Sequence, residues 1–297
     1  MASDVHDGEL LMQDAVVATR SVAGPLTWIT GIIIASLTGI LYLDILVDLA
    51  NEWWTQPEAS YGLLIPPFAL YVAYLKKNET LSLPAQPSSA GLMLIALACL
   101  VLITGKLASE FFLTRISFVP MLGGLVWTFW GFARFRSLAF PLILLLTMVP
   151  PPVIVYNAAA APLQLLASRI AADLAQFVGV SIYRDGNIIH LANTSLGVAE
   201  ACSGLHSLSA LIVASLLLGF LENGSLWARV MVVVLSIPLA IAVNVLRVTG
   251  TAILADFHSE FALGYYHAFS GWLVFVLGFA LLWLVSKVIF RFGGHRP

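Results

Sequence analysis

Three residues carry reactive side chains inside apolar stretches of the sequence. Cys202 stands in "VAEACSGLHSL", Arg247 stands in "NVLRVTG", and His267 opens another apolar run. A cysteine attacks as the thiolate, which a helix N-terminus or a nearby guanidinium favours. A histidine can take the thiol proton and return it to a leaving amine. Arginine stays protonated, so it can stabilise an oxyanion, hold the thiolate or bind a carboxylate.

Each of these residues also has an ordinary structural interpretation. A lone cysteine in a membrane helix commonly packs as a small hydrophobe, an arginine near a helix end extends to the headgroups, and a histidine at a span boundary anchors the interface. Ionisable residues within spans, however, generally face a polar cavity or a partner, which favours a functional role for Arg247. A shared role requires that the three residues lie at the same depth in the membrane.

Composition assigns the chain to the integral membrane proteins. The 297 residues are 60% hydrophobic and only 10% charged, against about 25% charged residues in soluble domains. The net charge of −2 and the lack of a basic stripe argue against nucleic-acid binding. Two cysteines are too few for a disulfide framework or a zinc site, and Cys99 reads as a buried hydrophobe. We expect no metal and no cofactor.

We expect an all-α polytopic protein with about eight transmembrane helices. Lys and Arg sort the connections so that both termini are cytoplasmic. Residues 1–24 form a cytoplasmic tail, 25–292 a single membrane-embedded domain, and 293–297 a second cytoplasmic tail. The expected spans lie near residues 25–48, 61–75, 90–107, 115–132, 137–155, 198–221, 226–250 and 266–290.

The stretch 156–180 is helical in pattern but carries polar residues, among them Arg169 and Asp173. Counting it as a span would turn Arg229 and the later basic residues outward, so we predict an amphipathic helix on the outer interface. Asp185-Gly186 follows, a turn signal between β-prone residues. A small extracytoplasmic β-hairpin should therefore precede Cys202.

Span counting brings the three reactive residues to the same surface. Cys202 enters at the outer end of the sixth span, Arg247 arrives at the outer end of the seventh, and His267 opens the eighth. Asn244 is three residues before Arg247 and shares its helix face. Ser203 and Gly204 keep the helix start small, so that a substrate backbone could approach.

The sequence resembles the exosortase/archaeosortase family over roughly residues 50–290. The combination of Cys-Ser-Gly, Asn-x-x-Arg and His at these spacings is more specific than any one motif. The blocks that carry the likeness are "ASYGLLIPPFALYVAYL", "PLILLLTMVPPPVIVYNAAAAPLQLLASRIAADL", "GVSIYRDGNIIHLANTSLGVAEAC", "AEACSGLHSL", "IPLAIAVNVLRV" and "HAFSGWLVF".

The resemblance implies a multi-pass cysteine protease or transpeptidase of the cytoplasmic (inner) membrane, with its active site on the extracytoplasmic side. Its partners would be exported proteins of the PEP-CTERM type, which end in a short motif such as Pro-Glu-Pro, one membrane helix and a basic cluster. Carried over, Cys202 is the nucleophile, Arg247 the stabiliser and His267 the acid/base. A thioester would pass to water or to a surface acceptor such as a polysaccharide or lipid amine; no nucleic acid is involved.

The sequence departs from some family members at His206, where they carry arginine. His206 is four residues after Cys202 and could contact it, serve as a base, or line a substrate groove. We favour His267 as the base because it stands at the family's position. Two other functions stay open: a transporter or export component for an envelope polymer or lipid, which would not need the thiol, and a thioester acyltransferase, which would.

Overall fold

The computed structural model describes residues 25–192, 194–198, 205–222, 224–258 and 264–292. The chain divides into two compact units, Met1–Asp48 and Leu49–Pro297. The first described helix, α2 (Pro25–Thr55), runs from the first unit into the second. The second unit carries all the candidate site residues.

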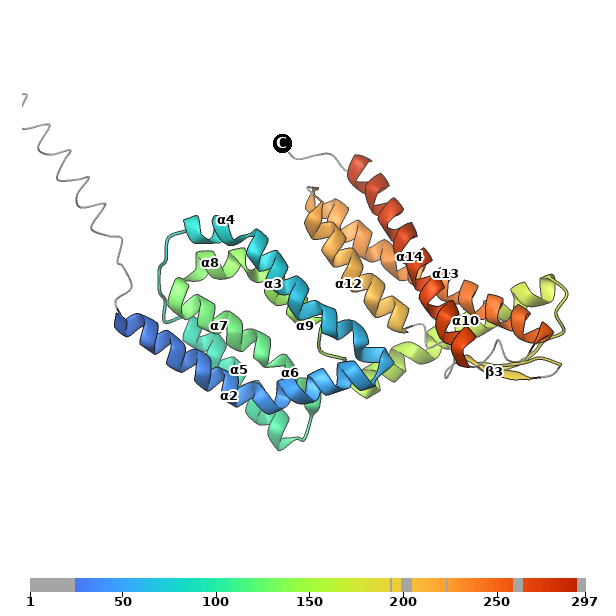
Figure 1. The fold of residues 1–297 in the computed structure, drawn as a ribbon, viewed down its shortest axis with the longest axis horizontal. Coiled ribbons are helices and arrows are strands. Elements are labelled where there is room, and N and C mark those ends of the chain that lie inside the picture. The colour runs from blue at the N-terminus through green and yellow to red at the C-terminus, as the bar shows by residue number, and fades with distance from the viewer. Residues whose placement is uncertain (1–24, 193, 199–204, 223, 259–263, 293–297) are drawn as a thin grey trace, which may run out of the picture. The chain divides into compact units, whose positions relative to one another are not determined.

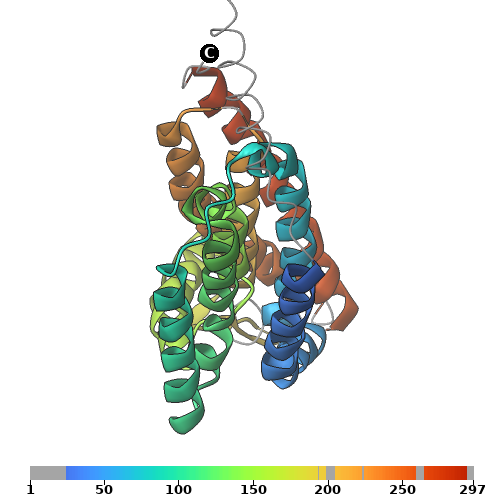
Figure 2. The same ribbon diagram turned by 90° about the vertical axis from the view of Figure 1, so that its left-hand side faces the viewer.

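The second unit is almost entirely helical, with one small sheet (Figures 1 and 2). After α2 the elements are η1 (Pro57–Leu64), α3 (Ile65–Leu75), α4 (Lys77–Ser82), α5 (Gly91–Leu107), α6 (Phe111–Ile116), α7 (Phe118–Trp130), α8 (Phe132–Ser137), α9 (Ala139–Leu146), α10 (Val153–Phe177), β1 (Tyr183–Asp185), β2 (Ile188–His190), β3 (Ser195–Gly197), α12 (Leu205–Leu221), α13 (Leu226–Phe257) and α14 (Gly264–Phe292).

Several helices have the length and composition of membrane spans. Within the described residues, five are long and apolar enough to cross a bilayer: Ile29–Thr55, Phe111–Trp130, Val153–Phe177, Leu226–Phe257 and Phe269–Phe292. Three further apolar helices are shorter: Ala59–Leu75, Gly91–Leu107 and Leu208–Leu221. The chain is therefore a multi-pass membrane protein, and the expected number of eight spans stays a prediction.

The expected span over 137–155 is not one continuous helix. Helix α9 ends at Leu146, and α10 begins at Val153, after the consecutive prolines 150–152. Proline lacks the amide hydrogen that a helix interior needs and disfavours the helical conformation of the residue before it. The stretch expected to lie on the interface, 156–180, forms most of α10. This helix is long and apolar enough to span, so its interfacial position stays a prediction.

The predicted hairpin is confirmed, and a third strand extends it. The strands are antiparallel in the order β1-β2-β3, with Asp185 opposite Ile188 across the first turn. The turn itself is Gly186-Asn187, one residue later than the expected turn signal. Gly186 has φ +59°, a conformation that glycine adopts without steric cost and that a two-residue hairpin turn requires.

Helix α13 is central to the C-terminal half and packs against α10, α12 and α14. The inner face of the sheet, through Ile189, Leu196 and Val198, joins one buried apolar cluster with Val248 and Ala252 of α13. The sheet is thus fixed to the part of α13 that follows Arg247.

A second buried cluster surrounds Trp53 and Met148. The Trp53 indole N–H donates to the Met148 carbonyl over 3.0 Å, which holds the end of α2 against the chain beyond α9. Helices α5 and α7 approach closely at Gly91 and Gly124, where a side chain on either would overlap the other helix. Small residues at helix contacts are typical of membrane proteins.

Contacts join the basic segments at one end of this unit. Thr80 of α4 and Ser137 of α8 share a 2.8 Å hydrogen bond, and Lys76 lies 5.7 Å from the Phe220 ring centroid at the end of α12. Each contact joins segments that are far apart in the sequence and carry or adjoin basic residues. The basic residues of these segments and of the neighbouring helix ends are Lys76, Lys77, Arg134, Arg136, Arg229, Lys287 and Arg291.

Candidate functional site

The structure describes the predicted site residues to different extents. Cys202, Ser203 and Gly204 lie outside the described residues. His206 lies in the first turn of α12 and His267 in the first turn of α14; for both, the helix position alone is described. Arg247 and Asn244 are described in full on α13. A site can be built from these two residues and the helix positions of His206 and His267.

The guanidinium of Arg247 lies against α14 at Gly271. A β-carbon added at Gly271 would lie 2.8 Å from Nη2 and 3.0 Å from Cζ of Arg247. Glycine at this position therefore lets the helix backbone approach the cation directly. His267 is four residues before Gly271 in the same helix, and residues at this spacing share a face. The face of α14 that carries His267 is thus the face that meets Arg247.

Arg247 and His267 lie at a similar distance from the basic end of the unit. Arg247 comes 21 residues after Leu226, the first residue of α13, which is about 32 Å of helix. His267 comes 20 residues before Lys287 in α14, which is about 30 Å. Since the hydrocarbon core is about 30 Å thick, both residues are one membrane thickness from the basic end.

Asn244 is buried and faces a small internal cavity. Its exposed fraction is 7%, and its Oδ1 atom accepts no hydrogen bond from the described residues. The cavity, about 10 Å³, is also lined by Gln164 of α10 and Leu208 of α12. A cavity of roughly this size holds a single water if polar partners are present. The amides of Gln164 and Asn244 supply such partners, so α10 belongs to the surroundings of the site.

The sheet leads directly to the cysteine. The Val198 amide donates to the Asn187 carbonyl over 2.9 Å and Val198 is fully buried, so the chain is anchored there. Four residues of chain span at most about 14 Å. The covalent chain therefore limits how far Cys202 can lie from Val198, whatever path it takes.

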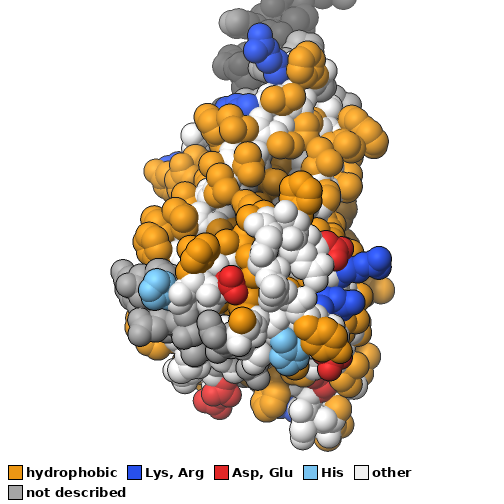
Figure 3. Space-filling view, turned by 90° about the vertical axis from the view of Figure 1, so that its right-hand side faces the viewer, with side chains coloured by type: hydrophobic (Ala, Val, Ile, Leu, Met, Phe, Trp, Pro, Cys, Tyr) orange, Lys and Arg blue, Asp and Glu red, His pale blue; other side chains and the backbone are white. Residues whose placement is uncertain are grey.

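One face of the molecule separates apolar from polar side chains (Figure 3). Hydrophobic side chains cover much of its upper part, below a few basic ones, while acidic, basic and histidine side chains gather in the lower part. Among the other histidines, His190 is half-buried and His258 is exposed. Among the residues that the structure describes, no three His, Cys, Asp or Glu side chains are grouped to hold a metal ion.

Sequence analysis missed two residues that shape the site. Gly271 stands in the quoted block "HAFSGWLVF", four residues after His267, and this spacing was the available signal. Gln164 reads from the sequence only as a polar residue of an amphipathic helix.

Comparison with known proteins identifies the family. The family model for transmembrane exosortases matches residues 53–284, which include Cys202, Arg247 and His267. No curated protein and no solved structure matches the chain. The family match covers well over half of the sequence and contains the described site helices α10, α12 and α13. The chain therefore belongs to the transmembrane exosortase family.

Proposed function

We propose that this chain is a membrane-embedded cysteine endopeptidase or transpeptidase that removes C-terminal sorting signals from exported proteins. The observation that carries the proposal is the contact of the Arg247 guanidinium with the His267-bearing face of α14 at Gly271. Family membership supports a role in processing sorting signals at a membrane. The short covalent distance from Val198 to Cys202 is consistent with a thiol at the same end of the unit.

The proposed reaction has two steps. In the first, the Cys202 thiolate attacks the scissile carbonyl carbon, the sulfur–carbon bond forms, and the carbon–nitrogen bond breaks. His267 takes the thiol proton and delivers it to the departing amine, which leaves with the membrane helix. In the second step, water or an acceptor amine attacks the thioester and releases the thiol.

Arg247 acts on charge in this mechanism. Its guanidinium stays protonated, so it cannot serve as a base. It can stabilise the oxyanion that forms on the attacked carbonyl, or hold the thiolate form of Cys202. Glycine at position 271 lets the guanidinium lie directly against the backbone of α14.

The proposed orientation has both termini in the cytoplasm and the site on the extracytoplasmic side. The clustering of basic residues at the opposite end of the second unit supports this orientation, because cytoplasmic ends of spans are rich in Lys and Arg. A substrate whose cleaved bond lies outside its own membrane helix suits a site at this depth.

The decisive experiment follows the C-terminus of a tagged exported protein that ends in a short motif, an apolar helix and a basic cluster. Mass spectrometry of that protein is compared between wild-type, Cys202→Ala, Arg247→Ala and His267→Ala chains. We expect the new C-terminus with the wild type alone, with all variants still inserted in the membrane. Normal processing by Cys202→Ala would overturn the proposal.

Two outcomes would point to the rival functions. A transporter of an envelope polymer or lipid would keep its activity in Cys202→Ser, because it needs no thiol. An acyltransferase would lose activity, but Cys202 would carry a fatty acyl chain rather than a peptide in the trapped thioester. Either result would exclude peptide processing as the main reaction.

A further inference from the structure

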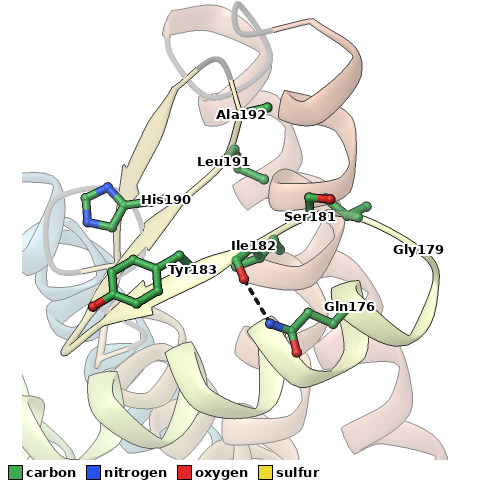
Figure 4. A pocket seen from close by; sticks show the side chains of 9 residues that line it. Gln176, Gly179, Ser181, Ile182, Tyr183, His190, Leu191 and Ala192 are labelled. Atoms are coloured by element: carbon green, nitrogen blue, oxygen red, sulfur yellow. Dashed lines mark hydrogen bonds between the residues drawn. The ribbon is translucent and has the colours of Figure 1, made fainter.

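The sheet forms one side of an open groove. The groove is shallow and wide open, with a volume of about 690 Å³. Its described lining comes from the end of α10, the loop before β1, and the strands β1 and β2, and includes Gln176, Tyr183 and His190 (Figure 4). Nothing in the proposed reaction uses these residues.

Two rings from neighbouring strands form a platform in this groove. Tyr183 of β1 and His190 of β2 are directly opposite in the register, and their ring centroids lie 5.9 Å apart with a 24° angle between the planes. Figure 4 shows the two rings side by side. The Tyr183 side chain is 70% exposed, so its ring is available for contact with a bound molecule.

The strand beneath this platform has an outer backbone edge that is only partly bonded. The Leu191 amide donates to the Thr194 carbonyl and the Val198 amide donates to the Asn187 carbonyl. The two-residue period of the strands then directs the Ile182 and Arg184 backbone groups away from β2. The Ile182 carbonyl accepts from the Gln176 side chain over 2.9 Å (Figure 4). Arg184 lies opposite Ile189, and by the same period this pair shares no ladder hydrogen bond. Such an edge can pair with an extended peptide.

The chemistry of the lining favours a peptide over an anionic headgroup. The described lining residues include no lysine or arginine. The nearby Arg184 guanidinium already donates to the Gly186 carbonyl over 2.6 Å. A phosphate would find no lysine or arginine among the lining residues, whereas a peptide backbone finds rings, an amide and the outward-facing backbone of Arg184.

The groove is tied to the proposed reaction centre by packing and by covalent connection. On its other face the sheet packs against Val248, the residue after Arg247. Its third strand runs to Val198, and Cys202 follows within about 14 Å of chain. The sheet therefore connects the groove to Arg247 by packing and to Cys202 through the chain.

We propose that the groove beside Tyr183 and His190 binds the exported protein in extended form, through the residues that precede its membrane helix. This assignment rests on the proposed function, since it names where that substrate is held. The sheet then acts as the recognition element, while the helices supply the catalytic groups.

Photo-crosslinking tests the occupant. A photoreactive phenylalanine analogue is placed at position 183 in the Cys202→Ala chain, with the tagged exported protein described above as the probe. The control position is 257, at the end of α13, where Phe257 is 73% exposed and lies outside the groove. We expect adducts from position 183 to residues just before the probe's membrane helix. Adducts to lipid alone, or equal adducts from both positions, would overturn the assignment.

Kinetics separates this proposal from the proposed function. Tyr183→Ala should raise KM about tenfold with kcat within about twofold, because the lost contact binds the substrate and the transition state equally. Tyr183→Phe keeps the ring and should restore KM, and Phe257→Ala should leave both constants unchanged. If Cys202→Ala still processes the probe, the proposed function fails. If Cys202→Ala is inactive but Tyr183→Ala has an unaltered KM, the groove assignment alone fails.

Discussion

The guanidinium of Arg247 rests directly on the backbone of Gly271, one helix turn after His267. The β-carbon of any other residue at position 271 would meet Nη2 at 2.8 Å. The obstructed atoms are the far end of a flexible side chain, so the arginine would move rather than the helix. The position of the Arg247 guanidinium therefore depends on residue 271 having no side chain.

Gly271→Ala should accordingly reduce processing without unfolding the protein. Alanine favours a helix by about 1 kcal/mol over glycine, so stability should be unchanged or higher. Displacing the guanidinium by about 1 Å should lower kcat on the order of 10²-fold. Processing of the tagged exported protein and thermal unfolding in detergent measure the two effects.

Gly250→Ala is the matched control for Gly271→Ala. Gly250 lies on α13 three residues after Arg247, and a β-carbon there meets nothing within 4 Å. It should keep full activity. Equal activity of Gly271→Ala and Gly250→Ala would mean that the position of the Arg247 guanidinium against Gly271 does not affect the reaction.

We expect Asn244 to contribute to the reaction and to lower the stability of the folded protein. A buried polar atom without a hydrogen bond costs about 1–3 kcal/mol, and Oδ1 of Asn244 accepts none from the described residues. Asn244→Leu removes that atom and fills part of the cavity shared with Gln164. We expect a Tm equal to or above that of the wild type and a kcat at least about tenfold lower.

Thr249→Val provides the comparison for Asn244→Leu. Thr249 is equally buried on the same helix, but its hydroxyl donates within α13 to the Val245 carbonyl over 2.8 Å. Its loss should leave processing nearly unchanged. A lower Tm with full activity in Asn244→Leu would identify Asn244 as a structural residue instead.

The sequence predicted the helical membrane class of the fold better than the points at which helices are interrupted. Apolar runs identify membrane helices because the bilayer requires them, and α13 and α14 appear where expected. The break between α9 and α10 was missed because the apolar run continues through Pro150, although consecutive prolines end a helix. The strand β3 was missed because three residues carry too little periodicity to be recognised.

The candidate site was predictable only through its reactive residue types. Arg247 and Asn244 stand out because polar groups are costly in a membrane helix. Gly271 and Gln164 gave no comparable signal, because the role of each depends on which helix lies opposite. Helix pairing is set by packing in three dimensions, and the spacing along one chain does not encode it.

The ion pair of Glu52 and Arg115 should be important for stability. The side chains are only 18% and 12% exposed, and their charged atoms are 2.5 Å apart. Arg115→Ala would leave a largely buried carboxylate alone, which typically costs 3–5 kcal/mol. The double variant Glu52→Gln, Arg115→Gln should recover much of this loss. Thermal unfolding of the single and double variants measures the coupling.

The pair of Lys287 and Glu222 is a natural control for this prediction. It has a similar 2.6 Å contact, but Lys287 is 50% exposed. Exposed pairs contribute about 0–1 kcal/mol. Lys287→Ala should therefore change Tm little. If Arg115→Ala were as mild as Lys287→Ala, burial of the Glu52 pair would have no energetic consequence.

Gly186 should control the order of the sheet through its backbone conformation. Its φ of +59° is strained for side-chain-bearing residues, while a β-carbon there meets nothing within 4 Å. The cost of Gly186→Ala is therefore purely conformational, about 1–2 kcal/mol. Gly186→Asn should cost less, because asparagine tolerates positive φ. Faster amide hydrogen exchange at Ile189 and Leu196, with an unchanged global Tm, would report local loosening.

The same substitutions should affect substrate binding, because the sheet leads to Cys202 and carries Tyr183. Gly186→Ala should raise KM for the exported protein, and Gly186→Asn should raise it less. An unchanged KM despite faster exchange would mean that substrate binding does not depend on the order of the sheet.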